Sequence, residues 1–113
     1  MAFDETLASR LRGLFEGNLD ISEKKMFGGL AFMCRGYMFV GIVGDELMAR
    51  VGPTHYLDAL KKTHVRKMDF TGKPMTGYVF VAAAGIRDEP SLVKWVSRSL
   101  QFIDTLPPKK TQP

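Results

Sequence analysis

The segment 24–43 constrains the fold of this chain more than any other part of its sequence. It opens with Lys-Lys-Met-Phe-Gly-Gly and continues as nearly unbroken apolar residues, interrupted at Arg35-Gly36. Two residues with glycine in second place, between apolar runs, are typical of a tight β-hairpin turn. The segment therefore predicts a hairpin, in a sheet that begins near Lys25 after a polar connection over 18–23.

Both faces of this hairpin are apolar. The predicted register pairs Cys34 with Tyr37 and Phe32 with Phe39. One face then carries Leu30, Phe32, Cys34, Tyr37, Phe39 and Val43, and the other carries Ala31, Met33, Met38, Val40 and Ile42. An antiparallel sheet that meets water usually has one polar face. Each large side chain left in water forfeits about 1.5–3 kcal/mol of burial free energy. The second face therefore needs a cover.

We expect that cover to be another protein. A second copy of this chain is the simplest choice, because a two-fold axis needs only one self-complementary surface. The candidate protein-interaction residues are Met33, Met38, Val40 and Ile42. The sequence thus predicts a homodimer, or a complex with a different protein, formed through the sheet.

The pair Gly28-Gly29 interrupts strand-like sequence and indicates a bulge, a sharp bend or a close backbone approach. It could instead cradle an anion beside Lys24 and Lys25. Phosphate loops, however, place their glycines between a strand and a helix, and strand-like residues follow here. A small-molecule pocket near Gly28-Gly29 and Cys34, in a binding protein or an enzyme, stays open as an alternative.

The rest of the chain predicts a single α+β domain. A helix capped by Asp4 is followed by three or four strands, a short helix from Pro53, two strands and a last helix beginning near Pro90. Runs of adjacent strands with helices around them favour two layers, an antiparallel sheet with helices on one face (α-β(3-4)-α-β(2)-α order). The domain is expected to span 1–106, and 107–113 has the composition of a disordered tail.

Length and composition set the class and the compartment. The 113 residues are enough for one domain, and the single cysteine, Cys34, excludes an internal disulfide framework. A lone thiol fits a reducing compartment. The start of the chain does not have the pattern of a signal peptide, and the apolar runs are too short to span a membrane. We expect a cytoplasmic protein without membrane contact.

The chain is basic, with a net charge of +4, and much of that charge lies in one segment. The cationic residues of this segment are Lys61, Lys62, Arg66, Lys67 and Lys73. They fit an edge strand protected by charge from unwanted pairing, or a patch that contacts the phosphates of nucleic acid. The first interpretation is favoured because no aromatic residue lies among them and no nucleic-acid-binding motif is present.

The side chains that commonly carry catalysis are not arranged for it. His55 and His64 lack the one-turn spacing of a helical metal pair, and no serine lies in a nucleophile elbow, G-x-S-x-G. The acidic pairs Asp45-Glu46 and Asp88-Glu89 fit a turn and a helix start. We therefore predict no enzymatic activity, no catalytic residue, no metal and no cofactor.

Three runs together resemble a known family. They are Lys25-Met26-Phe27-Gly28-Gly29, the stretch Asp45–Val51 and the stretch Asp69–Val81. In this order they resemble the TfoX N-terminal domain family, named for a bacterial regulator of natural competence also called Sxy, over roughly residues 4–105. The family supplies no established catalytic residues to carry over.

The resemblance implies a two-layer α+β domain in a bacterial, cytoplasmic, non-enzymatic protein. It also implies a link to transcriptional control through protein partners. The regulators carry a second, C-terminal domain, whereas this sequence ends at Pro113. We therefore expect an interaction or regulatory module whose link to competence does not transfer directly.

Overall fold

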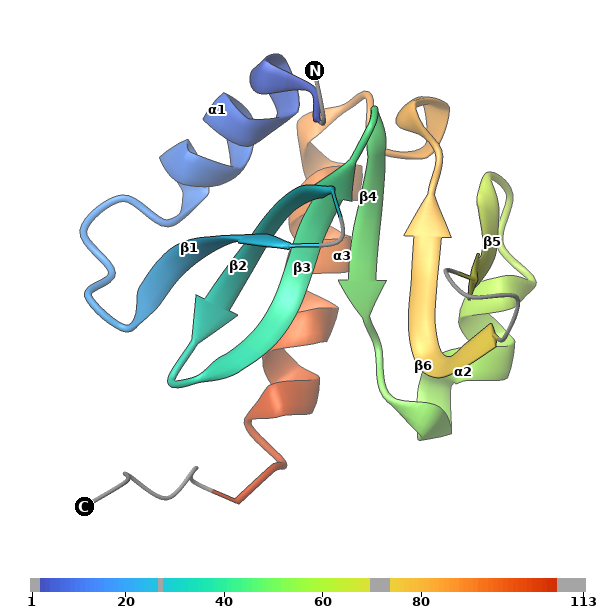
Figure 1. Ribbon diagram of the computed structural model, residues 1–113. Coiled ribbons are helices and arrows are strands. Elements are labelled where there is room, and N and C mark those ends of the chain that lie inside the picture. Colours follow the sequence, from blue (N-terminus) through green and yellow to red (C-terminus); the bar gives the residue numbers. More distant parts are fainter. Residues whose placement is uncertain (1–2, 27, 70–73, 108–113) are drawn as a thin grey trace.

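A six-stranded antiparallel sheet forms the centre of the molecule (Figure 1). The computed structural model describes residues 3–26, 28–69 and 74–107. The strands are β1 (Ile21–Met26), β2 (Gly29–Cys34), β3 (Tyr37–Val43), β4 (Glu46–Arg50), β5 (Val65–Asp69) and β6 (Pro74–Val81). Their order across the sheet is β1-β2-β3-β4-β6-β5, so β1 and β5 form its two edges.

Three helices cover one face of this sheet. They are α1 (Glu5–Leu14), α2 (Pro53–Leu60) and α3 (Glu89–Ile103), with a short 3-10 turn at Ala83–Gly85. Each helix contributes buried side chains to one core shared with the sheet, and α3 runs behind β3 and β4 (Figure 1). The two-layer α+β fold is confirmed. No helix in the described part of the chain has the length and apolar character that a membrane span requires.

The helix starts follow from the sequence. The Asp4 carboxylate accepts hydrogen bonds from the backbone N–H groups of Thr6 and Leu7 at the start of α1. Asp88 accepts from the backbone N–H of Ser91 at the start of α3. Such caps satisfy donors that have no partner within the helix.

The hairpin between β2 and β3 turns where the sequence predicts, but its register differs. Arg35 and Gly36 have φ angles of 52° and 88°, as a tight primed turn requires, and Cys34 pairs with Tyr37. Beyond the turn the register shifts, and Phe32 pairs with Val40 instead of Phe39. One extra residue in β3 makes this bulge.

Because of the bulge, the second face of the hairpin carries different β3 side chains from those expected. From Val40 onward, every side chain of β3 changes face relative to the unbulged register. Val40 and Ile42 are fully buried in the helix-covered core, so their expected place on the second face is wrong. Gly41, which has no side chain to bury, pairs with Ala31 on the second face instead.

We call the sheet surface opposite the helices the open face. One row across it, set by the strand pairing, runs through Lys24, Ala31, Gly41, Met48 and Phe80. Met48 and Phe80 are nevertheless buried there, together with Met68, in a second and smaller apolar cluster. The β4–β6–β5 half of the open face thus buries apolar side chains without a helical layer over it.

The sheet also begins earlier than predicted. β1 is a separate strand from Ile21, although the sequence gives residues 18–23 as a connection. Its central residues are exposed, so no apolar alternation marks it as a strand. Gly28 has φ of 71° after β1, and a Cβ atom on Gly29 would clash with the Ile42 carbonyl oxygen. The close backbone approach expected of this pair is confirmed at Gly29.

Candidate functional site

Two surfaces are candidate binding sites, one apolar and one cationic, and they lie on opposite sides of the sheet. The first is the β1–β3 half of the open face, where Met26, Met33 and Met38 lie. We call these three residues the methionine surface. The second is a basic hollow between α2 and α3.

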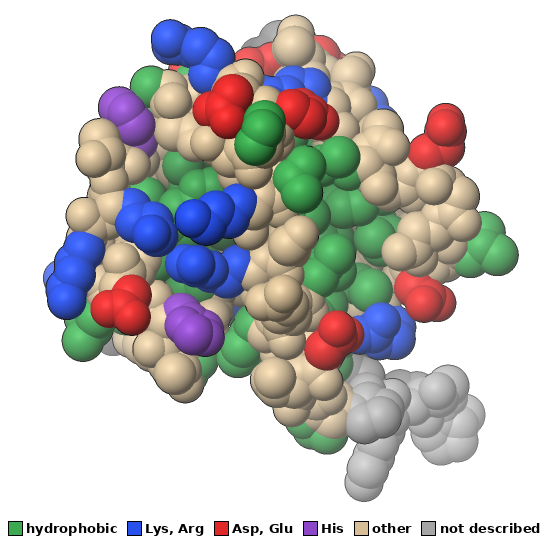
Figure 2. All heavy atoms as spheres, turned by 180° about the vertical axis from the view of Figure 1, so that it is seen from behind, with side chains coloured by type: hydrophobic (Ala, Val, Ile, Leu, Met, Phe, Trp, Pro, Cys, Tyr) green, Lys and Arg blue, Asp and Glu red, His purple; other side chains and the backbone are tan. Residues whose placement is uncertain are grey.

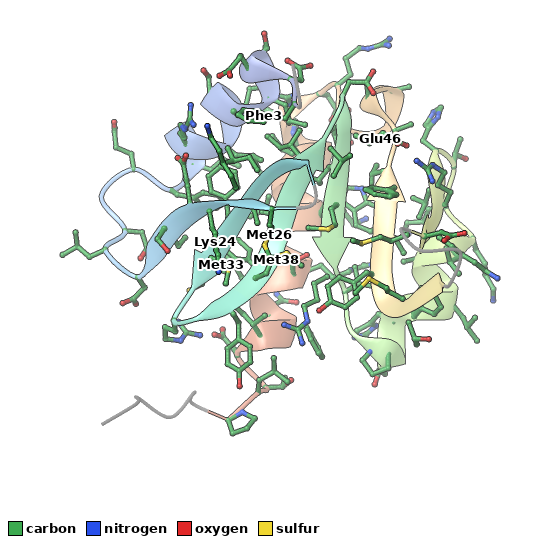
Figure 3. All side chains as sticks on the ribbon, viewed as in Figure 1. Phe3, Lys24, Met26, Met33, Met38 and Glu46 are labelled. Atoms are coloured by element: carbon green, nitrogen blue, oxygen red, sulfur yellow. The ribbon has the colours of Figure 1, made fainter. Side chains whose placement is uncertain are left out.

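The methionine surface takes one residue from each of three neighbouring strands. Met26 ends β1, and Met33 of β2 pairs directly with Met38 of β3. All three are partly exposed. Figure 3 shows them with Lys24 on the side of the sheet away from α3. The surface is thus adaptable and apolar, with a cation beside it.

On the other half of the open face, charged side chains stack on aromatic rings. The guanidinium of Arg66 lies 4.6 Å from the centre of the Phe80 ring. The same group forms a two-point ion pair with Glu46. The Arg50 guanidinium lies 5.3 Å from the rings of both Tyr78 and Phe102 of α3, so it bridges the two sides of the sheet, and it donates to the Met38 carbonyl. These stacked cations cover apolar surface that would otherwise meet water.

Of the four predicted interaction residues, the structure keeps two together. Met33 and Met38 lie on the open face, and Val40 and Ile42 lie in the core beneath it. Met26 joins the pair from β1. Met26 is not one of the four predicted interaction residues, because β1 is not predicted as a separate strand beside the hairpin.

The basic segment 61–73 does not form a single patch. Lys61 lies 3.9 Å from Asp58, and Arg66 is paired with Glu46 on the open face. Lys67 pairs with Val79, so its side chain leaves the opposite face of β5, and Lys73 lies outside the described residues. β5 is an edge strand, as the protective interpretation of these charges predicts.

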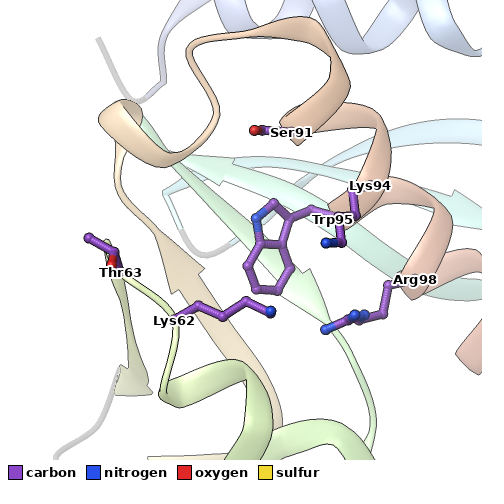
Figure 4. Close-up of a pocket in the computed structure, with 6 residues that line it drawn as sticks. All are labelled: Lys62, Thr63, Ser91, Lys94, Trp95 and Arg98. Atoms are coloured by element: carbon purple, nitrogen blue, oxygen red, sulfur yellow. The ribbon is translucent and has the colours of Figure 1, made fainter.

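Lys62 instead joins two cations from another part of the chain. A hollow of about 160 Å³ lies between the turn after α2 and the surface of α3. Its lining residues are Lys62, Thr63, Ser91, Lys94, Trp95 and Arg98. Figure 2 shows cationic side chains gathered over apolar surface on this side, and Figure 4 shows the six residues in place. We call this site the α2–α3 hollow.

The α3 residues of the hollow were missed for an identifiable reason. Positions 91, 94, 95 and 98 share one stripe of a helix, but apart from Trp95 this stripe is polar, whereas the sequence signal of the helix is its apolar stripe. Their partner Lys62 lies far away in the chain, and only the packing of α2 beside α3 brings it there. Spacing within α3 would have indicated the stripe, but not the hollow.

The pocket expected near Gly28-Gly29 and Cys34 is not one of the two cavities described for this structure. These cavities are the α2–α3 hollow and a neighbour of about 420 Å³ that is lined by His55 and Phe102. Neither touches the glycine pair or Cys34. Cys34 is buried, and burial raises the pKa of its thiol above the ordinary value, which disfavours the reactive thiolate.

The histidines do not come together with other metal ligands. His55 borders the larger cavity, and His64 occupies a left-handed position, with φ of 72°, before β5. Within the described ranges no three His, Cys, Asp or Glu side chains are grouped to hold a metal ion.

Comparison with known proteins gives one finding. Residues 14–103 match the model of the TfoX N-terminal domain. The chain matches no curated protein and no solved structure. Because the matched residues span most of the chain, it belongs to the TfoX N-terminal domain family.

Proposed function

We propose that this chain is a non-enzymatic interaction module that binds a second copy of itself through the methionine surface. One observation carries the proposal. Three flexible apolar side chains remain partly exposed on a sheet face that no helix of the described chain covers. On the other half of the same face, Arg66 and Arg50 stack on Phe80 and Tyr78. The partly exposed Met75 and Tyr78 of that half pack against the buried cluster of Met48, Met68 and Phe80.

The chemistry of the surface favours protein contact. Unbranched methionine side chains adapt to a partner's shape, and a two-fold axis allows one such surface to serve both partners. The free edge of β1 does not compete for this role, because residues 22–25 are exposed and mostly charged, which discourages strand addition. We therefore assign the contact to the face of the sheet and not to its edge.

The regulatory part of the proposal rests on the family. A TfoX N-terminal domain is of the competence-regulator type, and we propose that this module is cytoplasmic and acts in transcriptional control by protein contact. Direct nucleic-acid binding through segment 61–73 is not favoured, because the structure divides those cations between two faces of the sheet.

Sedimentation equilibrium of the purified chain at micromolar concentration tests the proposal. We expect a dimer for the wild type and a monomer for Met33→Glu and Met38→Glu, since a buried charge opposes association. Leu57→Glu is the matched control. Leu57 lies on α2 and is 70% exposed, so the same substitution there should leave the dimer intact. A monomeric wild type, or a dimer that only Leu57→Glu dissociates, contradicts the proposal.

A further inference from the structure

The α2–α3 hollow brings together three cations that the protein does not neutralise. Lys62 comes from the turn after α2, and Lys94 and Arg98 come from successive turns of α3. Figure 4 shows their charged ends directed into the same space beside the Trp95 ring. No carboxylate lines the hollow. Among the described residues, none of the three has an ion pair.

Four arginines elsewhere in the chain are neutralised by a carboxylate. Arg10, Arg12, Arg35 and Arg66 each contact a carboxylate. Arg98 instead lies 5.8 Å from the centre of the Trp95 ring. The ring holds the guanidinium over the hollow without cancelling its charge. Three like charges around one space repel each other, and an anion between them would relieve that repulsion.

The donors of the hollow suit phosphate. Two ammonium groups and a guanidinium fork are the cations that most often bind phosphate oxygens, and Thr63 adds a hydroxyl at the rim. The Ser91 hydroxyl is directed to Asp88, so it belongs to the helix cap. A volume of about 160 Å³ is below the roughly 300–1,000 Å³ of pockets for drug-sized ligands. A phosphate or pyrophosphate group fits this scale, whereas a nucleic-acid duplex would need an extended surface.

We propose that the α2–α3 hollow binds the phosphate or pyrophosphate group of a small molecule, through Lys62, Lys94 and Arg98. The site lies across the sheet from the methionine surface and does not depend on the proposed self-association. Substitutions on the methionine surface should therefore leave phosphate binding unchanged.

The chain carries its own reporter for this test, because Trp95 is its single tryptophan. We would titrate the full chain at low salt with pyrophosphate and with inorganic phosphate, following tryptophan fluorescence. Amide chemical shifts of residues 62–63 and 91–98 would follow binding that leaves the fluorescence unchanged. We expect saturable binding with Kd below about 1 mM. Lys94→Gln and Arg98→Gln should each weaken it by about tenfold, since each removes a charge-assisted contact.

Lys62→Gln and Lys61→Gln form a matched pair. The two residues are neighbours of equal charge, but only Lys62 lines the hollow. Loss of affinity in Lys62→Gln alone supports the site, and equal loss in both shows general charge attraction and overturns it. Circular dichroism would verify that each variant is folded. Absence of saturation in both signals for the wild type also overturns the proposal. So does a single-stranded oligonucleotide that binds more tightly than pyrophosphate with a steep salt dependence.

Discussion

The two faces of the sheet are both apolar, yet they are covered in different ways. On the helix side, branched side chains such as Leu47, Val79 and Val81 are fully buried beneath three helices. On the open face, Met48, Met68 and Phe80 are buried without a helix over them. Arg66 stacks on that cluster, and flexible methionines fill the space around it. An apolar second face therefore does not by itself require a partner over its whole area.

The two halves of the open face differ in how much apolar surface a partner could cover. In the β4–β6–β5 half of the open face, Met48, Met68 and Phe80 are buried, and the partly exposed Met75 and Tyr78 pack against them. In the β1–β3 half, Met26 and Met33 are partly exposed, and Met38, also partly exposed, packs at the border of that cluster. The bulge in β3 contributes to this difference, because it places Gly41 on the open face and sends Val40 and Ile42 inward. Less apolar surface remains to be covered than an unbulged hairpin would present.

The largest expected effect is a difference in stability loss between alanine substitutions at two adjacent positions of β4, one on each face of the sheet. Leu47 and Met48 are both essentially unexposed, at 0% and 1%, but they lie in different clusters. Leu47→Ala should lower the free energy of unfolding by about 3–5 kcal/mol, because the tightly packed core cannot collapse around the cavity. Met48→Ala should cost nearer about 2 kcal/mol, since flexible neighbours can fill the space. Urea denaturation measures both, and a larger loss for Met48→Ala would break the comparison.

The next largest effect on stability is expected at Gly29, where β2 and β3 approach closely. Gly29→Ala would push a Cβ atom against the Ile42 carbonyl and should destabilise the protein by about 1–3 kcal/mol. Gly13→Ala is the control, because nothing lies within 4 Å of its added Cβ. That substitution in α1 should stabilise by up to about 1 kcal/mol. Equal melting temperatures for the two variants would be inconsistent with the proposed contact.

A smaller effect concerns the helix-covered core. Ser99 is fully buried on α3, and its hydroxyl has no hydrogen-bond partner among the described residues. Ser99→Ala should raise the free energy of unfolding by about 1 kcal/mol, because an unsatisfied polar group leaves the core. Ser97→Ala, on the exposed side of the same helix, should give only the difference in helix propensity, about 0.5 kcal/mol. A loss of stability in Ser99→Ala would mean that the hydroxyl is satisfied.

The smallest effect is a pH dependence at the β1 edge. Arg12 donates two hydrogen bonds to Glu23, at 2.7 and 2.8 Å, and lowers the pKa of this carboxyl below its ordinary value of 4.5. The stabilisation is therefore complete above pH 4.5 and is lost as the pH falls toward the lower pKa of the folded state. Both side chains are exposed by more than a third, so we expect only about 0.5 kcal/mol. Unfolding midpoints of Glu23→Gln and wild type should differ less in acid than at neutral pH, and a constant difference would argue against the pair.

The sequence predicts the parts of this fold that depend on local signals. Asp4 and Asp88 cap their helices, and Arg35-Gly36 makes the turn, because each acts on residues next to it. The bulge in β3 is not predictable from the sequence, because Phe39 and Val40 are both apolar and either could face the core. β1 escapes prediction because an edge strand with exposed polar residues looks like a connection. The α2–α3 hollow escapes prediction because it joins Lys62 to α3 only through packing.

The most direct test of the account uses the methionine methyl groups themselves. The chain can be labelled at these methyl groups and observed by NMR with a soluble paramagnetic probe, at low and high protein concentration. We predict that the probe broadens Met26, Met33 and Met38 in dilute protein, and that high concentration protects these three signals. Met48 and Met68 should be protected at both concentrations, because the open-face cluster buries them. Broadening of the methionine surface that does not change with concentration, or equal broadening of Met48, would contradict the account.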